Sequence, residues 1–372
     1  MGNLNDTVKD YLNSGIEDIV KESILNFRDV NFDNYNDQGC NGYVFFGEHE
    51  VFRKRVAIKF YYYGEDSHQE VMLLKNVKHK NILNIWDAST VGEGWAYFIT
   101  DEICQGTIDD YLKESNISLI ESLKISMGIL SGLSELHNEE NSLVHRDIKS
   151  ANILLEEDFN PIIADFGSVK RIDKCSTFVN PSKNSMLYKP PESITDDKYT
   201  IQSDIYQVGL VMFQVFGGKL QYNFMDYLNF REVKQYNNLY DDFEKSKFVD
   251  SILEKNICKG ELIKLDSMPV YVGSRIKRII KNATHLNLEK RYSNTSEFFL
   301  DLHKLGTVPD WKKGDNDNYL CKYKDAKYRV RKASKGFVFE KKSNTWRKVP
   351  GVDYCTSKKK LFEMIDNKLK AV

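Results

Sequence analysis

The chain has 372 residues, of which 41% are hydrophobic and 29% are charged, and its formal net charge is −1. This length exceeds one ordinary domain of about 150 residues, and the hydrophobic share is enough to bury a core. No stretch approaches the ~18 uninterrupted apolar residues of a membrane span, and the first residues lack the basic-then-apolar layout of a signal peptide. We therefore expect a soluble protein with no membrane partner.

The six cysteines are scattered along the chain and form no short-spaced pair. Zinc sites and disulfide frameworks usually show such pairs in the sequence. The pattern indicates neither kind of site, and we expect a reducing, cytoplasmic location. No residue pattern indicates an oligomeric state.

Residues 1–28 form an extension with apolar side chains at spacings of three and four, which predicts one face of an amphipathic helix. The residues of this face are Val8, Tyr11, Leu12, Ile16, Ile19, Val20 and Ile24. We expect the helix to pack on the body of the protein. A helix that binds a partner is the alternative.

Short alternating strands begin near residue 32 and surround a turn that contains Gly39 and Gly42. Glycine lets backbone amides approach phosphate groups closely, because no side chain blocks the approach. The next strand, residues 56–59, is apolar and ends in Lys59, which in isolation would be a solvent-exposed charge. A segment with helical spacing comes next, around Glu70.

Residues 95–100 have the pattern of a further strand, and residues 100–104 form the link from this strand to the second half of the chain. Ser118 and Glu121 form a capping-box signature. Leucines and a methionine then recur at helical spacing up to Leu136, which predicts a buried helix. This helix delivers the chain into the loop at residues 145–152.

Residues 145–152 read His-Arg-Asp-Ile-Lys-Ser-Ala-Asn and place an acid, a base and an amide on one loop. Asp147 can accept a proton, Lys149 can lie beside a phosphate, and Asn152 can bind a divalent metal. Two short apolar segments, residues 153–155 and 161–164, predict a β-hairpin that leads to Asp165. Asn152 and Asp165 should therefore converge and hold a metal together.

In their order and spacing, these residues closely resemble the catalytic core of eukaryotic-type protein kinases that act on Ser and Thr, over residues 29–306. The resemblance implies an α+β fold with a β-rich N-lobe at about 29–100 and a helical C-lobe at about 105–306. It also implies ATP, Mg²⁺ (or Mn²⁺) and protein substrates. The matching residues are Lys59, Glu70, His145, Arg146, Asp147, Lys149, Asn152, Asp165, Gly167 and Glu192.

The resemblance also assigns roles to these residues. Lys59 would contact the ATP phosphates and pair with Glu70. Asp147 would act on the substrate hydroxyl, and Lys149 on the moving phosphoryl group. The metal would be bound by Asn152 and Asp165. The nucleotide pocket would comprise Gly39, Gly42, Val44, Ala57, Lys59, Thr100, Asp101 and Ile103. Asp37 stands where the family has its first glycine, which would weaken ATP binding.

Residues 165–192 would be the activation segment. Arg146 would receive a phosphate there, and Ser176 and Thr177 are the nearest donors. The alternative is a segment that is ordered without phosphate. Ser185 would bond the catalytic acid Asp147 and the loop lysine, which favours Ser and Thr as acceptors.

Two polar contacts with a structural role are also implied by the resemblance. Residues 203–217 are apolar almost all round and predict a buried helix. Asp204 at its start would anchor the backbone of the loop at 145–152, and Glu192 would pair with Arg291. Residues 218–273 have no pattern that we can assign.

None of the residues that inactive kinase relatives lose is missing here. We therefore expect an active Ser/Thr protein kinase, with autophosphorylation, rather than the alternative of a weak or inactive kinase-fold scaffold. A small-molecule phosphotransferase fits less well, because Lys149, Ser185 and Glu192 belong to the protein-kinase pattern.

The residues from 312 to 372 differ from the rest in charge, with 18 Lys and Arg against 7 Asp and Glu, whereas the preceding residues have 35 and 47. Alternation at residues 328–331, 337–340 and 345–349, then helical spacing at 357–369, predicts a small βββα domain. The charge and the interleaved aromatic residues fit nucleic-acid binding. Docking on an acidic protein, or on the acidic kinase body, and simple solvation are the alternatives.

Overall fold

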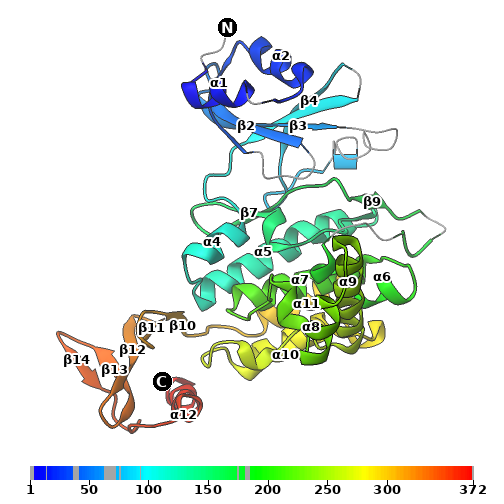
Figure 1. Ribbon diagram of the computed structural model, residues 1–372. Coiled ribbons are helices and arrows are strands. Elements are labelled where there is room, and N and C mark those ends of the chain that lie inside the picture. The colour runs from blue at the N-terminus through cyan, green and yellow to red at the C-terminus, as the bar shows by residue number, and fades with distance from the viewer. Residues whose placement is uncertain are drawn as a thin grey trace.

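The computed structural model describes residues 4–13, 15–36, 42–62, 73–74, 77–92, 94–173, 176–180 and 185–370. These residues form a β-rich N-lobe, a larger helical C-lobe and a sheet with one helix at the C-terminal end (Figure 1). This is the two-lobed α+β architecture that the sequence predicts. Along the described ranges, every helix is too short or too polar to span a lipid bilayer.

The N-lobe is built on a five-stranded antiparallel sheet in the order β1-β2-β3-β5-β4. Side chains alternate between the two faces of each strand. In β3, Val56, Ile58 and Phe60 are buried on one face, while Ala57 and Lys59 lie on the other. The strands are β1 (Val30–Asn36), β2 (Gly42–His49), β3 (Lys54–Tyr62), β4 (Ile85–Val91) and β5 (Trp95–Asp101).

Two helices, α1 (Asp6–Leu12) and α2 (Asp18–Asn26), cover the apolar face of this sheet (Figure 1). The prediction of one continuous helix was wrong, because the chain turns at Gly15, whose φ of 108° is open to glycine but costly for other residues. The predicted packing on the body is confirmed. The buried residues of the extension are Val8, Leu12, Ile16, Val20 and Ile24, which join the sheet residues in one cluster.

This cover supplies a test of how much the extension contributes to stability. Ile24 is 1% exposed, whereas its neighbour Leu25 is 41% exposed. We expect Ile24→Ala to lower the free energy of unfolding by about 2–5 kcal/mol, because it leaves a cavity in the core. The matched variant Leu25→Ala should stay within about 0.5 kcal/mol. Equal urea-unfolding midpoints for the two variants would show that the cover is not a packed core.

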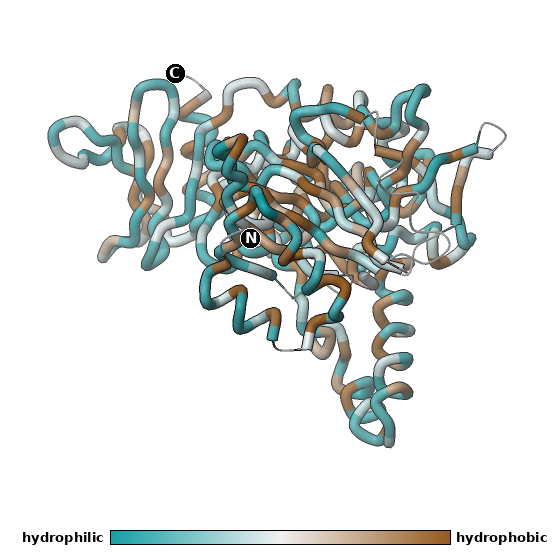
Figure 2. The backbone as a smooth tube through the Cα atoms, turned by 90° about the horizontal axis from the view of Figure 1, so that it is seen from above, coloured by the Kyte–Doolittle hydropathy of each residue, from teal (hydrophilic) through white to brown (hydrophobic). Residues whose placement is uncertain are grey.

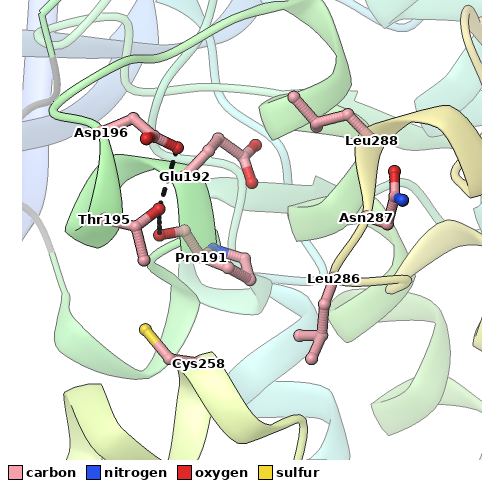
Figure 3. A pocket seen from close by; sticks show the side chains of 8 residues that line it. All are labelled: Pro191, Glu192, Thr195, Asp196, Cys258, Leu286, Asn287 and Leu288. Atoms are coloured by element: carbon pink, nitrogen blue, oxygen red, sulfur yellow. Dashed lines mark hydrogen bonds between the residues drawn. The ribbon is translucent and has the colours of Figure 1, made fainter.

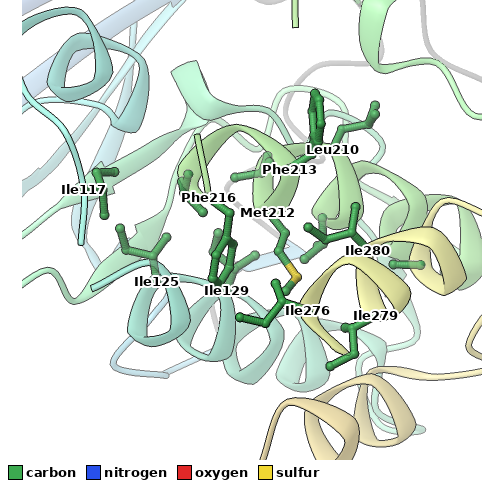
Figure 4. Packing of buried hydrophobic residues seen from close by; sticks show 14 of the residues in the cluster. Ile117, Ile125, Ile129, Leu210, Met212, Phe213, Phe216, Ile276, Ile279 and Ile280 are labelled. Atoms are coloured by element: carbon green, nitrogen blue, oxygen red, sulfur yellow. The ribbon is translucent and has the colours of Figure 1, made fainter. Parts of the chain in front are cut away.

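The C-lobe centres on the two long helices α5 (Leu119–His137) and α7 (Ile201–Val215) and on α10 (Ser274–Ala283). Figure 4 shows Ile129 of α5 beside Met212 of α7 and Ile276 of α10. The predicted capping box at Ser118 and Glu121 is present, with both hydrogen bonds formed. The predicted all-round burial of α7 is also confirmed.

The remaining elements of the C-lobe are short helices, 3-10 turns and small strand pairs. They are α4 (Ile108–Glu114), β6 (Leu143–Val144), η1 (Ser150–Asn152), β7 (Ile153–Leu155), β8 (Pro161–Ile163), β9 (Lys170–Arg171), η2 (Met186–Tyr188), α6 (Pro191–Thr195), η3 (Phe224–Tyr227), α8 (Phe230–Asn237), α9 (Asp242–Lys259), η4 (Leu265–Ser267), η5 (Leu288–Lys290) and α11 (Thr295–His303). Residues 218–273, which showed no pattern, thus contain mainly α8 and α9.

Residues 310–370, called the C-terminal unit below, form a five-stranded antiparallel meander and one helix. The prediction of three strands was incomplete, because two short strands precede them and are stabilised by their pairing. The elements are β10 (Asp310–Lys313), β11 (Tyr319–Tyr323), β12 (Ala326–Ala333), β13 (Gly336–Lys342), β14 (Trp346–Lys348) and α12 (Lys358–Lys370).

The C-terminal unit packs on the start of α5. Trp311 is 1% exposed, and its ring lies 4.9 Å from that of Phe362 and 6.4 Å from that of Tyr271 in the C-lobe. The amide of Ile120 donates to the carboxylate of Asp310 at 3.0 Å. The C-terminal unit thus contacts the C-lobe along β10, whereas the partner of its basic residues stays open among the alternatives given above.

Candidate active site

The loop between β6 and β7 is held in place by a buried carboxylate from α7. Asp204 is 0% exposed and accepts from the amides of His145 and Arg146, each at 2.8 Å. The predicted anchor is confirmed. It also fixes an unusual backbone, since Arg146 has a φ of 68°, in a region that non-glycine residues rarely occupy.

Two further partners of Asp204 were missed by sequence reasoning. His137 Nε2 and the hydroxyl of Tyr199 each lie 2.8 Å from its carboxylate oxygens. Burial by itself would raise the pKa of Asp204, but the hydrogen bond with His137 and the nearby imidazoles lower it below the usual value. His137 ends α5, so only the packing of α5 on α7 brings it to this point.

Asp147 lies in this loop with one carboxylate oxygen engaged and the other free. Its Oδ2 accepts from Lys149 Nζ at 2.8 Å and from Asn152 Nδ2 at 2.9 Å. Its Oδ1 is buried and has no hydrogen-bond partner among the residues described. Burial raises the pKa of Asp147, an effect that the Lys149 ammonium partly offsets. The free oxygen can accept a proton from a hydroxyl placed beside it.

The two predicted metal ligands flank the β7–β8 hairpin. Ile153 pairs with Ile163, and the amide of Ala164 donates to the carbonyl of Asn152 at 2.9 Å. Asn152 and Asp165 are thereby brought together, as the sequence predicts. Asp165 has a φ of 58°, a strained conformation that the hairpin and the loop impose.

The donor atoms at this point suit a hard divalent cation. The amide nitrogen of Asn152 is used by Asp147, and its oxygen has no hydrogen-bond partner in the described part of the chain. Burial works against ionisation of Asp165, but the Lys59 ammonium lowers the pKa of that carboxyl below its usual value. A carboxylate and an amide oxygen are the ligands that Mg²⁺ prefers, so the residues fit the expected ion.

Lys59 joins the two lobes. Its Nζ lies 3.0 Å from Asp165 Oδ1, an ion pair that sequence reasoning did not predict. The predicted partner Glu70 lies outside the described residues, as do Gly39 and Asp37 of the glycine turn. The side chain of Lys59 thus reaches from β3 to the candidate metal site.

The nucleotide-pocket candidates share one face of the N-lobe sheet. Val44 is opposite Lys59 across β2 and β3, and Ala57 is opposite Thr100 across β3 and β5. Directly opposed residues point to the same face. Helices α1 and α2 cover the other face, so this one faces the C-lobe (Figure 1). Gly42 closes its edge, where an added Cβ would lie 1.9 Å from the Phe60 carbonyl oxygen.

Asp101 and Ile103 lie where β5 leaves the sheet. The side chain of Asp101 points away from the candidate pocket and accepts from Trp86 Nε1 at 3.2 Å. At Asp101, the backbone is therefore the part that can face a nucleotide. The bonding of adenine to main-chain atoms of Asp101 and Ile103 stays a prediction.

Arg146 contacts the activation segment at two points. Its Nε donates to the carbonyl of Ser168 and its Nη1 to that of Asn180, both at 2.5 Å. Ser176 Oγ donates to the carbonyl of Phe178 at 2.7 Å, while Thr177 is exposed. The guanidinium thus holds backbone carbonyls near the start and in the middle of the segment.

Ser185 is not placed as the sequence predicts. Its side chain is exposed and forms no hydrogen bond with Asp147 or Lys149 within the described ranges. Asp147 Oδ2 accepts from Lys149 and Asn152 instead, and the chain after Ser185 turns at once into η2.

The predicted ion pair beneath the activation segment is present. Arg291 donates from Nη1 and Nη2 to the two carboxylate oxygens of Glu192, at 2.8 and 3.0 Å. A cavity of about 360 Å³ beside it was not predicted (Figure 3). It is lined by Pro191, Glu192, Thr195, Asp196, Cys258, Leu286, Asn287 and Leu288.

Comparison with known proteins places this site in a family. Residues 37–299 match the family model described as protein kinase domain. Cysteine-rich receptor-like protein kinase 24 of Arabidopsis thaliana is 28% identical over 51% of this chain and 32% of its own length. RGS domain-containing serine/threonine-protein kinase A of Dictyostelium discoideum is 29% identical over 57% and 20%.

Serine/threonine-protein kinase STY46 of Arabidopsis thaliana is 31% identical over 42% of this chain and 27% of its own length. The matched part of the chain thus spans only 20 to 32% of these relatives. The family model, in contrast, covers well over half of the chain, including the Asp147 loop and Asp165. The protein therefore belongs to the protein kinase family.

Proposed function

We propose that this protein transfers the γ-phosphoryl group of ATP to Ser and Thr hydroxyls of protein substrates, including its own. Members of the protein kinase family use ATP and a divalent metal, and the oxygen donors of Asn152 and Asp165 support Mg²⁺ (or Mn²⁺). The observation that carries the proposal is the presence of two ion pairs at the site: Lys59 pairs with Asp165, and Lys149 pairs with Asp147.

The proposed mechanism depends on where these charges lie. Phosphoryl transfer requires mainly positioning and electrostatic stabilisation. Lys59 would bind the phosphates from the N-lobe, and Lys149 would balance charge on the moving phosphoryl group. The free Oδ1 of Asp147 would orient the acceptor hydroxyl and take its proton. When bound, the metal would neutralise phosphate charge at Asn152 and Asp165.

Acceptance of Ser and Thr is supported by the names of two relatives, which are serine/threonine-protein kinases. The alternative of an inactive scaffold has less support, because Lys59, Asp147, Asn152 and Asp165 are all present. Incubation with γ-labelled ATP and a protein substrate, followed by phosphoamino-acid analysis, tests both points. Label on Tyr alone would refute the acceptor assignment, and no label would refute the activity.

Lys59→Met is expected to lower labelled phosphate transfer by about 10²- to 10³-fold, because it removes a preorganised positive group from the phosphates. The matched variant is Lys54→Met on the same strand, whose side chain is 63% exposed. It should keep normal activity. Equal activities of the two variants in the same filter-binding assay would contradict the role of Lys59.

We propose two alternatives for the activation segment: it is ordered by phosphorylation, or it is ordered without phosphate. Ser176 and Thr177 are the candidate phosphorylation sites, with Arg146 as the receptor. The bonds from Arg146 to two backbone carbonyls support the other form, a segment that is ordered without phosphate. Mass spectrometry of the purified active protein, looking for phosphate on residues 176 and 177, separates them.

We also propose a division into an extension (1–28), a kinase domain (29–306) and a basic C-terminal domain (312–372) that binds nucleic acid or an acidic protein. The helices α1 and α2 and the meander β10 to β14 support these boundaries.

A cytoplasmic location is proposed from the free thiols of Cys104, Cys258, Cys321 and Cys355.

A further inference from the structure

We propose that one face of the C-terminal sheet binds a nucleic-acid duplex through its phosphate backbone. This deepens the partner proposed above by naming the face and the kind of nucleic acid, and it does not depend on phosphoryl transfer. The face, called the outward face below, consists of Lys322, Lys327, Arg329, Arg331, Glu340, Lys342, Trp346 and Lys348.

The register of the meander separates two faces of opposite character. Cys321 is opposite Tyr328, and Val330 is opposite Phe339, so these buried residues share the inward face. Phe362 of α12 packs there against Trp311 and Tyr319. The intervening residues all point the other way. In Figure 2, hydrophilic and hydrophobic residues alternate in short steps along these strands.

The outward face is basic, and three of its six cations have no ion-pair partner among the described residues. Lys322 is directly opposite Lys327, an arrangement of like charges that costs stability unless an anion is bound. These two lysines and Lys342 are exposed and have no ion-pair partner in the described part of the chain. The other three cations are paired: Asp353 accepts from Lys348 at 2.9 Å, and Glu340 pairs with both Arg329 and Arg331.

Glu340 holds the two arginines of this face in fixed positions. Its buried carboxylate accepts from Arg329 Nε at 2.6 Å and from Arg331 Nε and Nη2 at 3.0 and 2.9 Å. The guanidinium of Arg329 also lies 4.4 Å from the centre of the Trp346 ring. Among the described residues, the terminal nitrogens of Arg329 have no hydrogen-bond acceptor, so an already ordered donor group is presented to solvent. Such ordering reduces the entropy lost on binding.

The chemistry of the face favours nucleic acid over protein. The central part of a protein–protein interface is poor in lysine and rich in apolar and aromatic contacts. Here lysines and arginines dominate, and the apolar side chains of this face are Leu320 at its edge and Val338, which is opposite Arg331 and 1% exposed. An array of cations whose central apolar side chain is buried matches a phosphate backbone, which supplies most non-specific binding energy.

The position of Trp346 on the outward face favours a duplex over single-stranded nucleic acid. Single-stranded nucleic acid binds by stacking its bases on free aromatic rings. The Trp346 ring is covered by Arg329 at 4.4 Å and approached by Lys342 at 5.9 Å, so it is not free for a base. A duplex keeps its bases stacked and offers only phosphates and groove edges. The C-terminal unit projects from the C-lobe on the side away from the N-lobe (Figure 1), which leaves room for such a ligand.

The test uses the full chain and fluorescence anisotropy with fluorescein-labelled DNA and RNA duplexes of about 20 base pairs, over a series of salt concentrations. Each phosphate contact contributes about 0.9 to the slope of log affinity against log salt. We expect Lys322→Gln/Lys327→Gln to reduce that slope by roughly 2. Its matched control is Lys359→Gln/Lys360→Gln, with the same loss of charge at exposed residues of α12.

Weaker duplex binding with the smaller salt slope in the first double variant, and normal binding in the control, is the expected result. Three results would overturn the proposal: no duplex binding at low salt, equal weakening in both variants, or tighter binding of a single strand or a poly-glutamate peptide than of a duplex. Labelled ATP transfer to a general substrate, measured on the same samples, should be unchanged. Failure of that assay in the unmodified protein would refute the kinase activity and leave the binding result standing.

Discussion

Replacing Asp147 by Asn is expected to lower the turnover number for phosphate transfer by about 10²- to 10⁴-fold, because the general base is lost. Asn keeps the shape of the side chain and can still accept from Lys149 and Asn152 through its oxygen. The amide NH2 then takes the place of Oδ1, the oxygen that has no partner, and it cannot accept a proton. Steady-state assays with ATP and a protein substrate measure the change, and the KM for ATP should move little.

A stability measurement separates this effect from unfolding. Burial raises the pKa of Asp147, so the carboxylate is less stable in the folded protein than in the unfolded chain. Asp147→Asn should therefore leave the melting temperature unchanged or raise it. The control is Asp158→Asn, in the turn of the β7–β8 hairpin, where the side chain is 68% exposed. Equal activity losses in both variants would be incompatible with a specific role for Asp147.

Arg291→Met is expected to lower the free energy of unfolding by about 3–5 kcal/mol, because it leaves the buried carboxylate of Glu192 without its cation. The side chain of Arg291 is 0% exposed and that of Glu192 is 6% exposed, so water cannot replace the lost partner. Guanidinium unfolding followed by fluorescence measures the difference. Lys290→Met, an exposed neighbour, should have almost no effect.

The double variant Glu192→Gln/Arg291→Met supplies a sharper check. Removing the buried charge together with its partner should recover a large part of the loss, because most of the loss arises from an unpaired charge. Ser203 Oγ, which donates to Glu192 Oε1 at 2.6 Å, can still bond the glutamine oxygen. A double variant that is less stable than Arg291→Met alone would show that packing, and not charge, dominates this contact.

The catalytic loop and its anchors could be predicted from the sequence because their signals are local. Asn152 and Asp165 are separated by one short hairpin, whose apolar strands and turn are visible in the residue pattern. The family resemblance then supplied Asp204 and the Glu192–Arg291 pair across longer distances. The structure confirms these contacts. Roles that need a nucleotide or a substrate, such as those of Thr100 and Ile103, stay predictions.

Other features depend on packing that no local pattern encodes. The apolar spacing of the extension continues in phase through Ile16, so it does not show that the helix ends before Gly15. Strand β10 has one buried residue, Trp311, and is defined by its pairing with β11. His137 reaches Asp204 only because two helices pack side by side. Ser185 is the opposite case, because the resemblance implies hydrogen bonds to Asp147 and Lys149 that the described residues do not show.

The cover formed by α1 and α2 has a consequence for any shortened form of the protein. The family match begins at residue 37, after both helices and after β1. A fragment cut there would present β2 as an unpaired strand edge beside the bare side chains of Phe45, Ile58 and Phe60. Such an edge is a template for association with other chains. We therefore expect a fragment that starts at residue 37 to associate more readily than the chain that retains α1, α2 and β1.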